Sequence, residues 1–347
     1  MRIEEHISLA PLTTFRIGGA ARFFVHAVSV QELQEALVFA HEKNLPVFIF
    51  GSGSNVLVPD EGFDGLVIKI ELRGIELRHE QEKTLLIAEA GELWDDVVAR
   101  AVAENLWGIE NLSGIPGTVG GAIVQNIGAY GAAVSEHLLW VEVYDSGSGA
   151  VRQMTNAECL FEYRDSFFKH DDGRHVVLRA AFVLSTIPMP NISYRDIASR
   201  MQGKTPTLPV LRDTVLSIRE GKFPDLFVEG TAGSFFKNPI VTTAEAEGLA
   251  KRFPEMPLFT MPETAGIKIP LAWILDKELA MRGFAVGGAR LFESQPLVIA
   301  ARFGTPASDV YELAMLVREK IHAACGITIE SEVNIVESKN KKEKTEK

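Results

Sequence analysis

The chain has 347 residues, of which 46% are hydrophobic and 23% charged, and its formal net charge at pH 7 is −11. This length leaves room for two or three domains with cores of their own, and the composition excludes a collagen-like, mucin-like or wholly disordered protein. The acidic charge repels a phosphate backbone, so we expect no nucleic-acid partner, although a local basic pocket for a small phosphorylated ligand is compatible with it.

The cysteines and the apolar runs of the sequence indicate in which cellular compartment the protein is found. Cys159 and Cys325 are the only cysteines and form no CxxC pair, which argues against a zinc ribbon or a disulfide scaffold and is typical of a reducing compartment. No apolar run approaches the roughly 20 residues of a membrane span, and residues 1–6 show no signal-peptide stretch. We therefore expect a cytoplasmic protein without a membrane partner. We also expect no metal site, because the eight histidines form no HExxH or Cys/His cluster.

The first predicted unit covers residues 1–70 and mixes helix with strand. Ser29 and Glu32 form a capping box ahead of apolar residues at helical spacing, which predicts a helix that begins there. Short buried strands are predicted at residues 47–50 and 66–70. The pattern favours a small α/β unit.

The second predicted unit, residues 71–212, is richer in strands. Leu93, Val97, Val98 and Ala101 mark one amphipathic helix. Strands are predicted at residues 75–79, 84–88, 139–145 and 176–187. Strands with few helices indicate a mixed α+β domain.

A third predicted unit covers residues 213–326, with helices near 243–253 and 271–279. Its last helix has Thr305 as cap, Pro306 in the first turn and Gly326 just past the end. Residues 327–335 then alternate between apolar and polar, which predicts a strand. Residues 337–347 contain no apolar residue, so we expect a disordered tail there.

Glycine-rich stretches are the most informative local feature. Six of the eighteen residues at 114–131 are glycine, and residues 51–55 read Gly-Ser-Gly-Ser-Asn after an apolar strand. Such loops let the backbone approach a ligand and can form an anion nest, but neither matches a Rossmann or Walker A motif. One loop alone favours a simple tight turn. Two loops of the same kind favour pyrophosphate binding.

The ordered set of motifs resembles the UDP-N-acetylenolpyruvoylglucosamine reductases, the MurB family, from about residue 10 to 336. The matching motifs are residues 12–19 (LTTFRIGG), 51–55 (GSGSN), 114–117 (GIPG), 125–131 (QNIGAYG), 163–166 (YRDS), 232–239 (AGSFFKNP) and 332–333 (EV). Any one of these motifs is weak, whereas their order along the chain is highly specific.

The resemblance implies an α+β fold of the vanillyl-alcohol-oxidase type that binds FAD, followed by a C-terminal α+β substrate-binding domain. It implies FAD-binding subdomains at 1–70 (completed by 327–336) and 71–212, and a substrate domain at 213–326. The implied reaction is the reduction of a UDP-sugar enolpyruvyl ether by NADPH through FAD, which gives the peptidoglycan precursor UDP-N-acetylmuramate. We expect the loop-containing subtype and a monomer.

Three residues match the family's catalytic positions: Arg164, Ser234 and Glu332. Hydride addition to the vinyl carbon leaves an enolate on the carboxylate-bearing side, and a guanidinium such as Arg164 meets carboxylate oxygens as a fork. Ser234 matches the proton donor, and Glu332 would assist if protonated or bridged by water. Taken singly, each residue would more often be an ion pair, a turn residue or a solvated carboxylate.

The resemblance also implies binding residues. The cofactor positions are Gly51, Ser52, Gly53, Ser54, Asn55, Gly114, Ile115, Pro116, Gly117, Gly121, Asn126, Gly128, Ala129, Tyr130 and Arg219. The substrate positions are Tyr163, Tyr194, Lys222, Asn238 and Lys268, of which Tyr194 would close over the UDP group. Asn334 stands where many relatives have a basic residue, which puts one flavin contact in doubt.

Two rival functions stay open on the sequence. A flavin oxidase of the same fold, acting on a small sugar or hydroxy acid, would share the glycine loops but would use oxygen. A nucleotide-sugar-binding regulatory domain would keep the fold and lack catalysis. The three matching catalytic positions argue against both.

Overall fold

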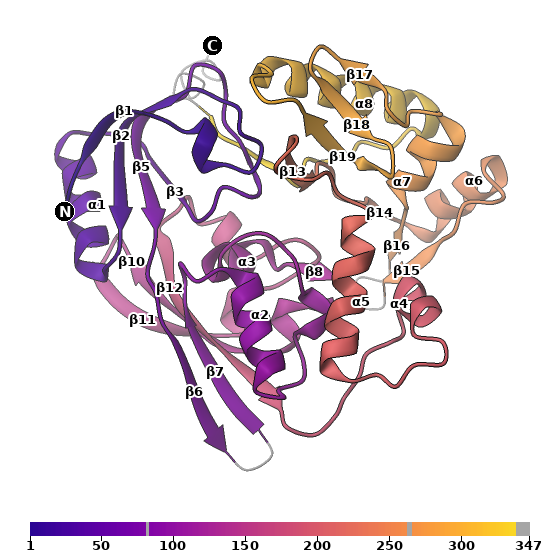
Figure 1. Cartoon of the computed structure of the whole chain (residues 1–347). Helices are drawn as coiled ribbons and strands as arrows, with labels where there is room; N and C mark the ends of the chain where they lie inside the picture. The colour runs from indigo at the N-terminus through magenta and orange to yellow at the C-terminus, as the bar shows by residue number, and fades with distance from the viewer. Residues whose placement is uncertain (81–82, 262–265, 338–347) are drawn as a thin grey trace.

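The protein is described by a computed structural model that covers residues 1–80, 83–261 and 266–337. Two sheets built from the first half of the chain lie side by side, and the C-terminal elements, orange to yellow in Figure 1, form a separate group. Within these residues, no helix combines the length and the apolar character that crossing a bilayer requires.

The first sheet has the order β1-β2-β5-β3 and is parallel except at β1. Its strands are β1 (Glu4–Ser8), β2 (Ala20–Ala27), β5 (Phe63–Ile70) and β3 (Val47–Phe50). Helix α1 (Val30–Glu42) connects β2 to β3, and the Ser29 hydroxyl accepts a hydrogen bond from the Glu32 N–H, as predicted. Only Phe50 of β3 is buried, because β3 is an edge strand, so the prediction of a buried strand at 47–50 was wrong in this respect.

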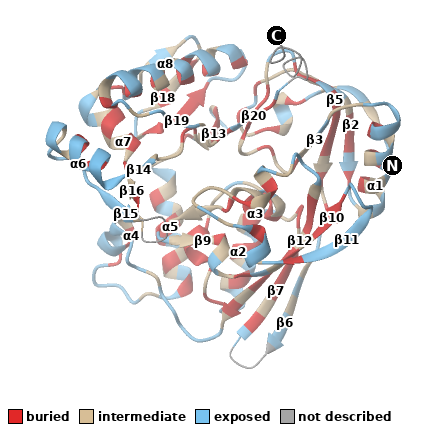
Figure 2. Ribbon diagram, turned by 180° about the vertical axis from the view of Figure 1, so that it is seen from behind, coloured by how far each residue is buried: buried red, intermediate tan, exposed pale blue. Residues whose placement is uncertain are grey.

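The second sheet has the order β11-β10-β12-β7-β6 and is antiparallel throughout. Its strands are β6 (Ile75–Glu80), β7 (Lys83–Glu89), β10 (Leu138–Asp145), β11 (Ala150–Thr155) and β12 (His175–Ser185). All four strands predicted between residues 75 and 187 are present. Figure 2 shows buried residues along β12, β7 and the strands of the first sheet.

Helices α2 (Trp94–Ala103) and α3 (Val119–Gln125) pack against this sheet and share one hydrophobic core with the first sheet. Trp94 is fully buried, whereas Leu93 precedes the first turn and is 41% exposed. Leu93 was therefore wrongly assigned to the apolar face. The common core spans both predicted FAD subdomains, whose boundaries stay a prediction.

Two helices come between the halves of the chain. Helices α4 (Arg195–Arg200) and α5 (Leu208–Glu220) pack on each other over a small core that includes Ile197, Leu211 and Tyr130. Helix α5 packs against α2, and Figure 1 draws it between α2 and the C-terminal group.

The C-terminal group is built around a second core, to which Phe15, Ile17 and Leu57 of the N-terminal segment also contribute. One sheet contains β13 (Gly230–Ser234), β19 (Gln295–Ala301), β18 (Ala289–Phe292) and β17 (Ala285–Val286). A smaller sheet contains β14 (Ile240–Val241), β16 (Gly266–Lys268) and β15 (Phe259–Met261). The helices are α6 (Thr243–Arg252), α7 (Leu271–Trp273), which continues as a π-helical turn to Glu278, and α8 (Ala307–Cys325).

Helix α8 is ended by a residue next to it in sequence, but it is capped at its start by a residue far away in sequence. Gly326 ends the helix in the left-handed conformation at φ 73°, as predicted. At the start, Pro306 is the N-cap rather than the first helical residue, so the prediction of Thr305 as cap was wrong. The Asp60 carboxylate accepts hydrogen bonds from the N–H groups of Ala307 and Ser308, so the capping group comes from another part of the chain.

The chain end returns to the first half of the molecule. Among residues 327–337, only β20 (Asn334–Ile335) is a strand, and it pairs in parallel with β4 (Val56–Leu57). The strand predicted over residues 327–335 is therefore mostly irregular, although Ile329 and Val333 are buried as the alternation requires. Residues 338–347 of the predicted tail lie outside the described residues.

Candidate functional site

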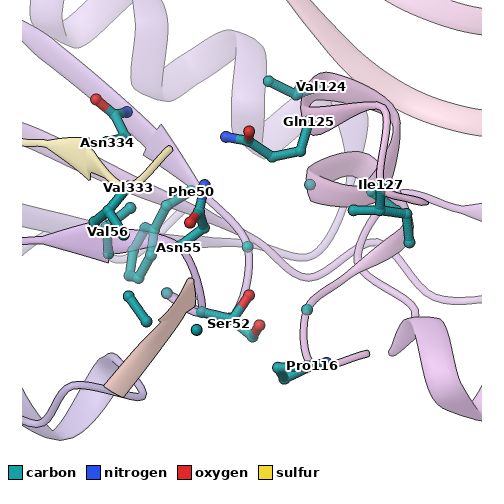
Figure 3. Close-up of a pocket in the computed structure, with 18 of the residues that line it drawn as sticks. Phe50, Ser52, Asn55, Val56, Pro116, Val124, Gln125, Ile127, Val333 and Asn334 are labelled. Carbon is teal, nitrogen blue, oxygen red and sulfur yellow. The ribbon is translucent and has the colours of Figure 1, made fainter. Parts of the chain in front are cut away.

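A cavity of about 2310 Å³ opens where the first half of the chain, α5 and the C-terminal group meet. Typical small-molecule sites occupy roughly 300–1,000 Å³, so this cavity has room for a large cofactor and a substrate together. Figure 3 shows Ser52, Pro116, Gln125 and Asn334 around part of it, drawn from four separate segments.

The first glycine loop follows β3 and is closely packed. Gly53 has φ +65°, and a Cβ there would lie 2.5 Å from the Leu12 carbonyl oxygen. A Cβ at Gly51 would lie 2.1 Å from Thr118 Oγ1, in the second loop. Only glycine fits at these two positions, and the two loops touch.

The second loop is held by a charged pair on helices α2 and α5. The Gly114 N–H donates a 2.6 Å hydrogen bond to Asp95 Oδ1, and Arg212 donates two bonds to the same carboxylate. Gly117 has φ +136°, and a Cβ there would lie 3.0 Å from Ser54 Oγ. We call residues 51–55 and 114–117 the glycine cradle.

The cradle has the chemistry that FAD needs. Its backbone comes close to the cavity on both sides, which suits a pyrophosphate. Among the residues that the structure describes, Ser52 Oγ and Gln125 Oε1 are buried without a hydrogen-bond partner, and both residues line the cavity. Buried polar groups in proteins are normally satisfied, so these two atoms fit contacts to a polar cofactor.

A hairpin next to the cradle carries Tyr130. Strands β8 (Gly128–Ala129) and β9 (Ala132–Ala133) form it, and Tyr130 lies at its turn with φ 51°. The Tyr130 ring meets the Tyr194 ring edge-on at 5.3 Å. Arg219 lines the cavity close by, and burial lowers the pKa of its guanidinium, an effect that Tyr130 opposes.

Arg164 and Glu332 meet at the far side of the cavity. Arg164 Nε lies 2.9 Å from Glu332 Oε1, and Arg164 Nη2 donates a hydrogen bond to the Gly128 carbonyl oxygen. Both side chains are about one-fifth exposed, at 22% and 19%. Ser234, at the end of β13, lines the same cavity, so the three residues expected to be catalytic border one space.

The main chain of Glu332 is fixed from both halves of the molecule. Its N–H donates to the Phe235 carbonyl oxygen at 2.8 Å, and its carbonyl oxygen accepts from Asn55 Nδ2 at 3.1 Å. Asn55 therefore links the glycine cradle directly to Glu332.

Two of the expected substrate residues line the cavity and contact each other. Lys222 Nζ lies 2.5 Å from Asp196 Oδ2 and above the rings of Tyr130 and Tyr194, at 5.5 and 6.0 Å. Burial works to lower the pKa of Lys222, but Asp196 together with Tyr194 and Tyr130 outweighs it and the pKa is raised. The ammonium therefore stays charged at neutral pH.

The other expected substrate residues, Tyr163, Asn238 and Lys268, are not among the described residues that line the cavity. Lys268 Nζ lies 5.4 Å from the Tyr163 ring, which also faces the Arg164 guanidinium at 5.6 Å. Asn126 does not line the cavity either. It ends α3 at φ 41° and donates to the Glu162 carbonyl oxygen.

Sequence reasoning missed several polar residues that line the cavity, including Lys169, Lys237, Gln295 and Arg318. Lys169 follows the YRDS motif by three residues and Lys237 belongs to the AGSFFKNP motif, so both stood beside motifs already singled out. Burial and the neighbouring Lys237 lower the pKa of Lys169 to about 8. We call Arg164, Lys169, Lys222 and Lys237, together with Glu332, the cationic pocket.

The described residues contain no group of three or more His, Cys, Asp or Glu side chains that could hold a metal ion.

Comparison with known proteins agrees with this geometry. A family model for an FAD binding domain matches residues 21–155, and one for the UDP-N-acetylenolpyruvoylglucosamine reductase C-terminal domain matches residues 225–336. The chain is similar to the UDP-N-acetylenolpyruvoylglucosamine reductase of Neisseria gonorrhoeae, with 36% identity over 338 residues, 96% of this chain and 97% of the relative. It is 37% identical to the reductase of Bdellovibrio bacteriovorus over 336 residues, 96% and 99% of the two chains.

One solved structure is similar over nearly the whole length. The crystal structure of the Thermus caldophilus reductase matches with a TM-score of 0.70 and 25% identity, covering 97% of this chain and all of that one. The expected α+β FAD-binding fold with an α+β C-terminal domain is confirmed.

Proposed function

The chain belongs to the UDP-N-acetylenolpyruvoylglucosamine reductase family, and on that premise we propose how its own residues carry out the reaction. It is a flavoprotein oxidoreductase of peptidoglycan precursor synthesis. The proposed reductant is NADPH, the proposed substrate is the enolpyruvyl ether of UDP-N-acetylglucosamine and the proposed location is the cytoplasm. FAD, when bound, would take hydride from the nicotinamide and pass it to the enolpyruvyl double bond.

The observation that carries this proposal is the Arg164–Glu332 pair, which borders the same cavity as Ser234 and the glycine cradle. Negative charge builds up on the carboxylate side of the substrate after hydride addition. Arg164 is held by the hydrogen bond from Nη2 to the Gly128 carbonyl oxygen and by the ion pair with Glu332, while its buried Nε makes no hydrogen bond, so the guanidinium is positioned beside the place where that charge develops. In this scheme Glu332 orients Arg164.

Ser234 is the proposed proton donor to the carbon next to the carboxylate. A hydroxyl is a weak acid, and it needs a positively charged, partly dry site to release a proton. Lys237, Lys169 and Arg164 line the same cavity and supply that charge. Lys222, beside Tyr194, is placed to meet an anionic group of the substrate, and Tyr194 would close over the UDP end.

The test follows the flavin colour without oxygen. We expect the purified protein to be yellow, NADPH to bleach it, and the enolpyruvyl UDP-sugar to restore the colour. No bleaching by NADPH would refute the reductase reading. Colour restored by air and not by the sugar would support the oxidase instead.

Ser234→Ala separates the two half-reactions. Bleaching by NADPH should stay near the wild-type rate, whereas reoxidation by the sugar should slow by about 10²–10⁴-fold, the usual contribution of a general acid. Ser308→Ala, an exposed serine on α8, is the matched control and should change neither step. Fast reoxidation of the Ser234→Ala protein would show that the proton comes from another group.

A further inference from the structure

Lys169 makes one contact that the proposed mechanism does not use. It ends a short 3₁₀ helix, Phe167–Lys169, and lines the cavity. Its Nζ donates a 2.8 Å hydrogen bond to the main-chain carbonyl oxygen of Arg164. The lysine therefore touches the backbone of the residue that is proposed to bind the enolate.

The backbone of Arg164 needs such a contact. Arg164 has φ +57°, a left-handed conformation that is unfavourable for a residue with a side chain. Residues 162 and 165 bond each other through both backbone groups, and the Ser166 hydroxyl donates to the Val124 carbonyl oxygen at 2.6 Å. Arg164 is the residue of this turn whose side chain reaches Gly128 and Glu332. Lys169 donates a charged hydrogen bond to the main chain of that same residue.

Two cations and two carboxylates surround the Lys169 ammonium. Lys237 and Arg164 repel its ammonium, whereas Glu332 and Asp165 attract it, and Asp165 is already paired with His170 at 2.8 Å. Burial, followed by Lys237, lowers the pKa of the ammonium to about 8. A half-buried cation beside two other cations is unfavourable for stability, which favours a role in the site over a purely structural one.

We infer that Lys169 is a positioning residue for the proposed enolate site: by binding the Arg164 carbonyl oxygen it fixes the turn that aims the guanidinium, and its charge adds to the cationic pocket. This inference rests on the proposed function. It makes the second half-reaction, but not the first, depend on an ammonium at position 169.

The test compares Lys169→Met and Lys169→Arg in the flavin-loaded enzyme. In Lys169→Met, bleaching by NADPH should be unchanged, whereas reoxidation by the enolpyruvyl UDP-sugar should slow by about 10- to 100-fold, as expected for a misplaced catalytic group. Lys169→Arg keeps a charged donor and should restore most of the rate. Lys251→Met, an exposed lysine on α6, is the control for loss of a surface charge and should behave like wild type.

A pH profile provides a readout that simple packing would not change. An ammonium is present below its pKa and lost above it, so wild-type reoxidation should fall as pH rises through about 8. In Lys169→Arg this alkaline decline should disappear. This profile also decides the question if Lys169→Met fails to retain flavin, because the arginine variant keeps the charge and differs from wild type in its titration.

Three results would overturn the inference: a Lys169→Met enzyme with normal reoxidation, an equal slowing of both half-reactions, or an alkaline decline that persists in Lys169→Arg. A wild-type enzyme that the sugar never reoxidises would refute the proposed function instead, so the two failures are distinguishable.

Discussion

The glycine cradle and the cationic pocket face the same cavity but are built in opposite ways. The cradle depends on main chain brought close by residues without side chains, as at Gly51 and Gly53. The pocket depends on long charged side chains, each held by a counter-charge or a carbonyl oxygen. A rigid main-chain surface suits a cofactor that stays bound, whereas paired charges can release and rebind ligands that exchange at every turnover.

The sharpest test of this division is Arg164→Lys, for which we expect the largest effect among the variants that compare the two regions. Lysine is a point charge and cannot reach Glu332 and the Gly128 carbonyl oxygen as a fork. Reoxidation by the UDP-sugar should slow by about 10²–10³-fold, the usual loss when one oxyanion donor is removed. Flavin absorbance per protein should stay unchanged. A loss of flavin would mean that the two regions are not independent.

Gly51→Ala tests whether the close packing of the glycine cradle is needed to bind the flavin. The new Cβ would lie 2.1 Å from Thr118 Oγ1, so Thr118 would have to move and would lose its cap on α3. We expect flavin affinity to fall by about tenfold or more, that is by at least about 1.4 kcal/mol, measured by titrating the apoprotein with FAD.

The matched control for Gly51→Ala is Gly248→Ala on α6, where a Cβ meets nothing within 4 Å. It should leave flavin binding unchanged and should slightly stabilise the helix. Equal flavin affinity in both variants would contradict the close-packing argument for the cradle.

Asp95→Asn tests how the cradle is anchored to α5. Asparagine can still accept from the Gly114 N–H but loses the ion pair with Arg212. Because both side chains keep some exposure to solvent, we expect a decrease of about 1 kcal/mol in the free energy of unfolding at pH 7, measured by urea titration.

The pH dependence of stability in Asp95→Asn tests whether the carboxylate of Asp95 stabilises the fold in its charged form. Burial works to raise the pKa of Asp95, but the hydrogen bonds from Arg212 and Gly114 outweigh it, and the pKa falls below the usual 3.8. The pair therefore stabilises the fold above that value and is lost as pH falls below it. The difference between wild type and Asp95→Asn should shrink in acid, and a constant difference would contradict this account.

The smallest effect is expected at the edge of the cationic pocket. The Asp196 carboxylate forms an ion pair with the Lys222 ammonium, so an anionic substrate has to compete with Asp196 for that ammonium. Asp196→Asn should lower the KM for the UDP-sugar by about two- to fivefold, the strength of a partly exposed ion pair. Asp213→Asn, on α5 and outside the cavity lining, is the control. A higher KM in Asp196→Asn would show that the carboxylate assists binding rather than competing.

Local patterns predicted what short stretches of chain decide. The Ser29 cap, the strands between residues 75 and 187 and the Gly326 terminus are confirmed, because each depends on neighbours in sequence. The start of α8 was wrong because its cap is the carboxylate of Asp60, which no local pattern contains. The strand over 327–335 was wrong because these residues pair with two different segments, Ser331 in an isolated bridge to Phe236 and Asn334–Ile335 with β4, and form no continuous ladder.

The candidate site shows the same limit. The resemblance pointed to Arg164, Ser234 and Glu332, and they border one cavity. Nothing in the spacing of residues 164 and 169 indicates that a lysine side chain reaches back to the Arg164 carbonyl oxygen, because that contact depends on a left-handed turn followed by a 3₁₀ helix. Asn126 and Asn55, expected at the cofactor, make main-chain contacts that position other residues.

The pairing of β20 with β4 has a consequence for how the enzyme is made. Asn334 donates its N–H to the Asn55 carbonyl oxygen, and Val336 donates to that of Leu57. While the nascent chain is still emerging from the ribosome, the loop that follows β3 lacks this partner until residues 332–336 have been synthesised. Long-range closure of this kind is slow and comes late in folding, so the newly made protein should acquire its yellow colour only after translation of the C-terminal segment, however early the first sheet forms.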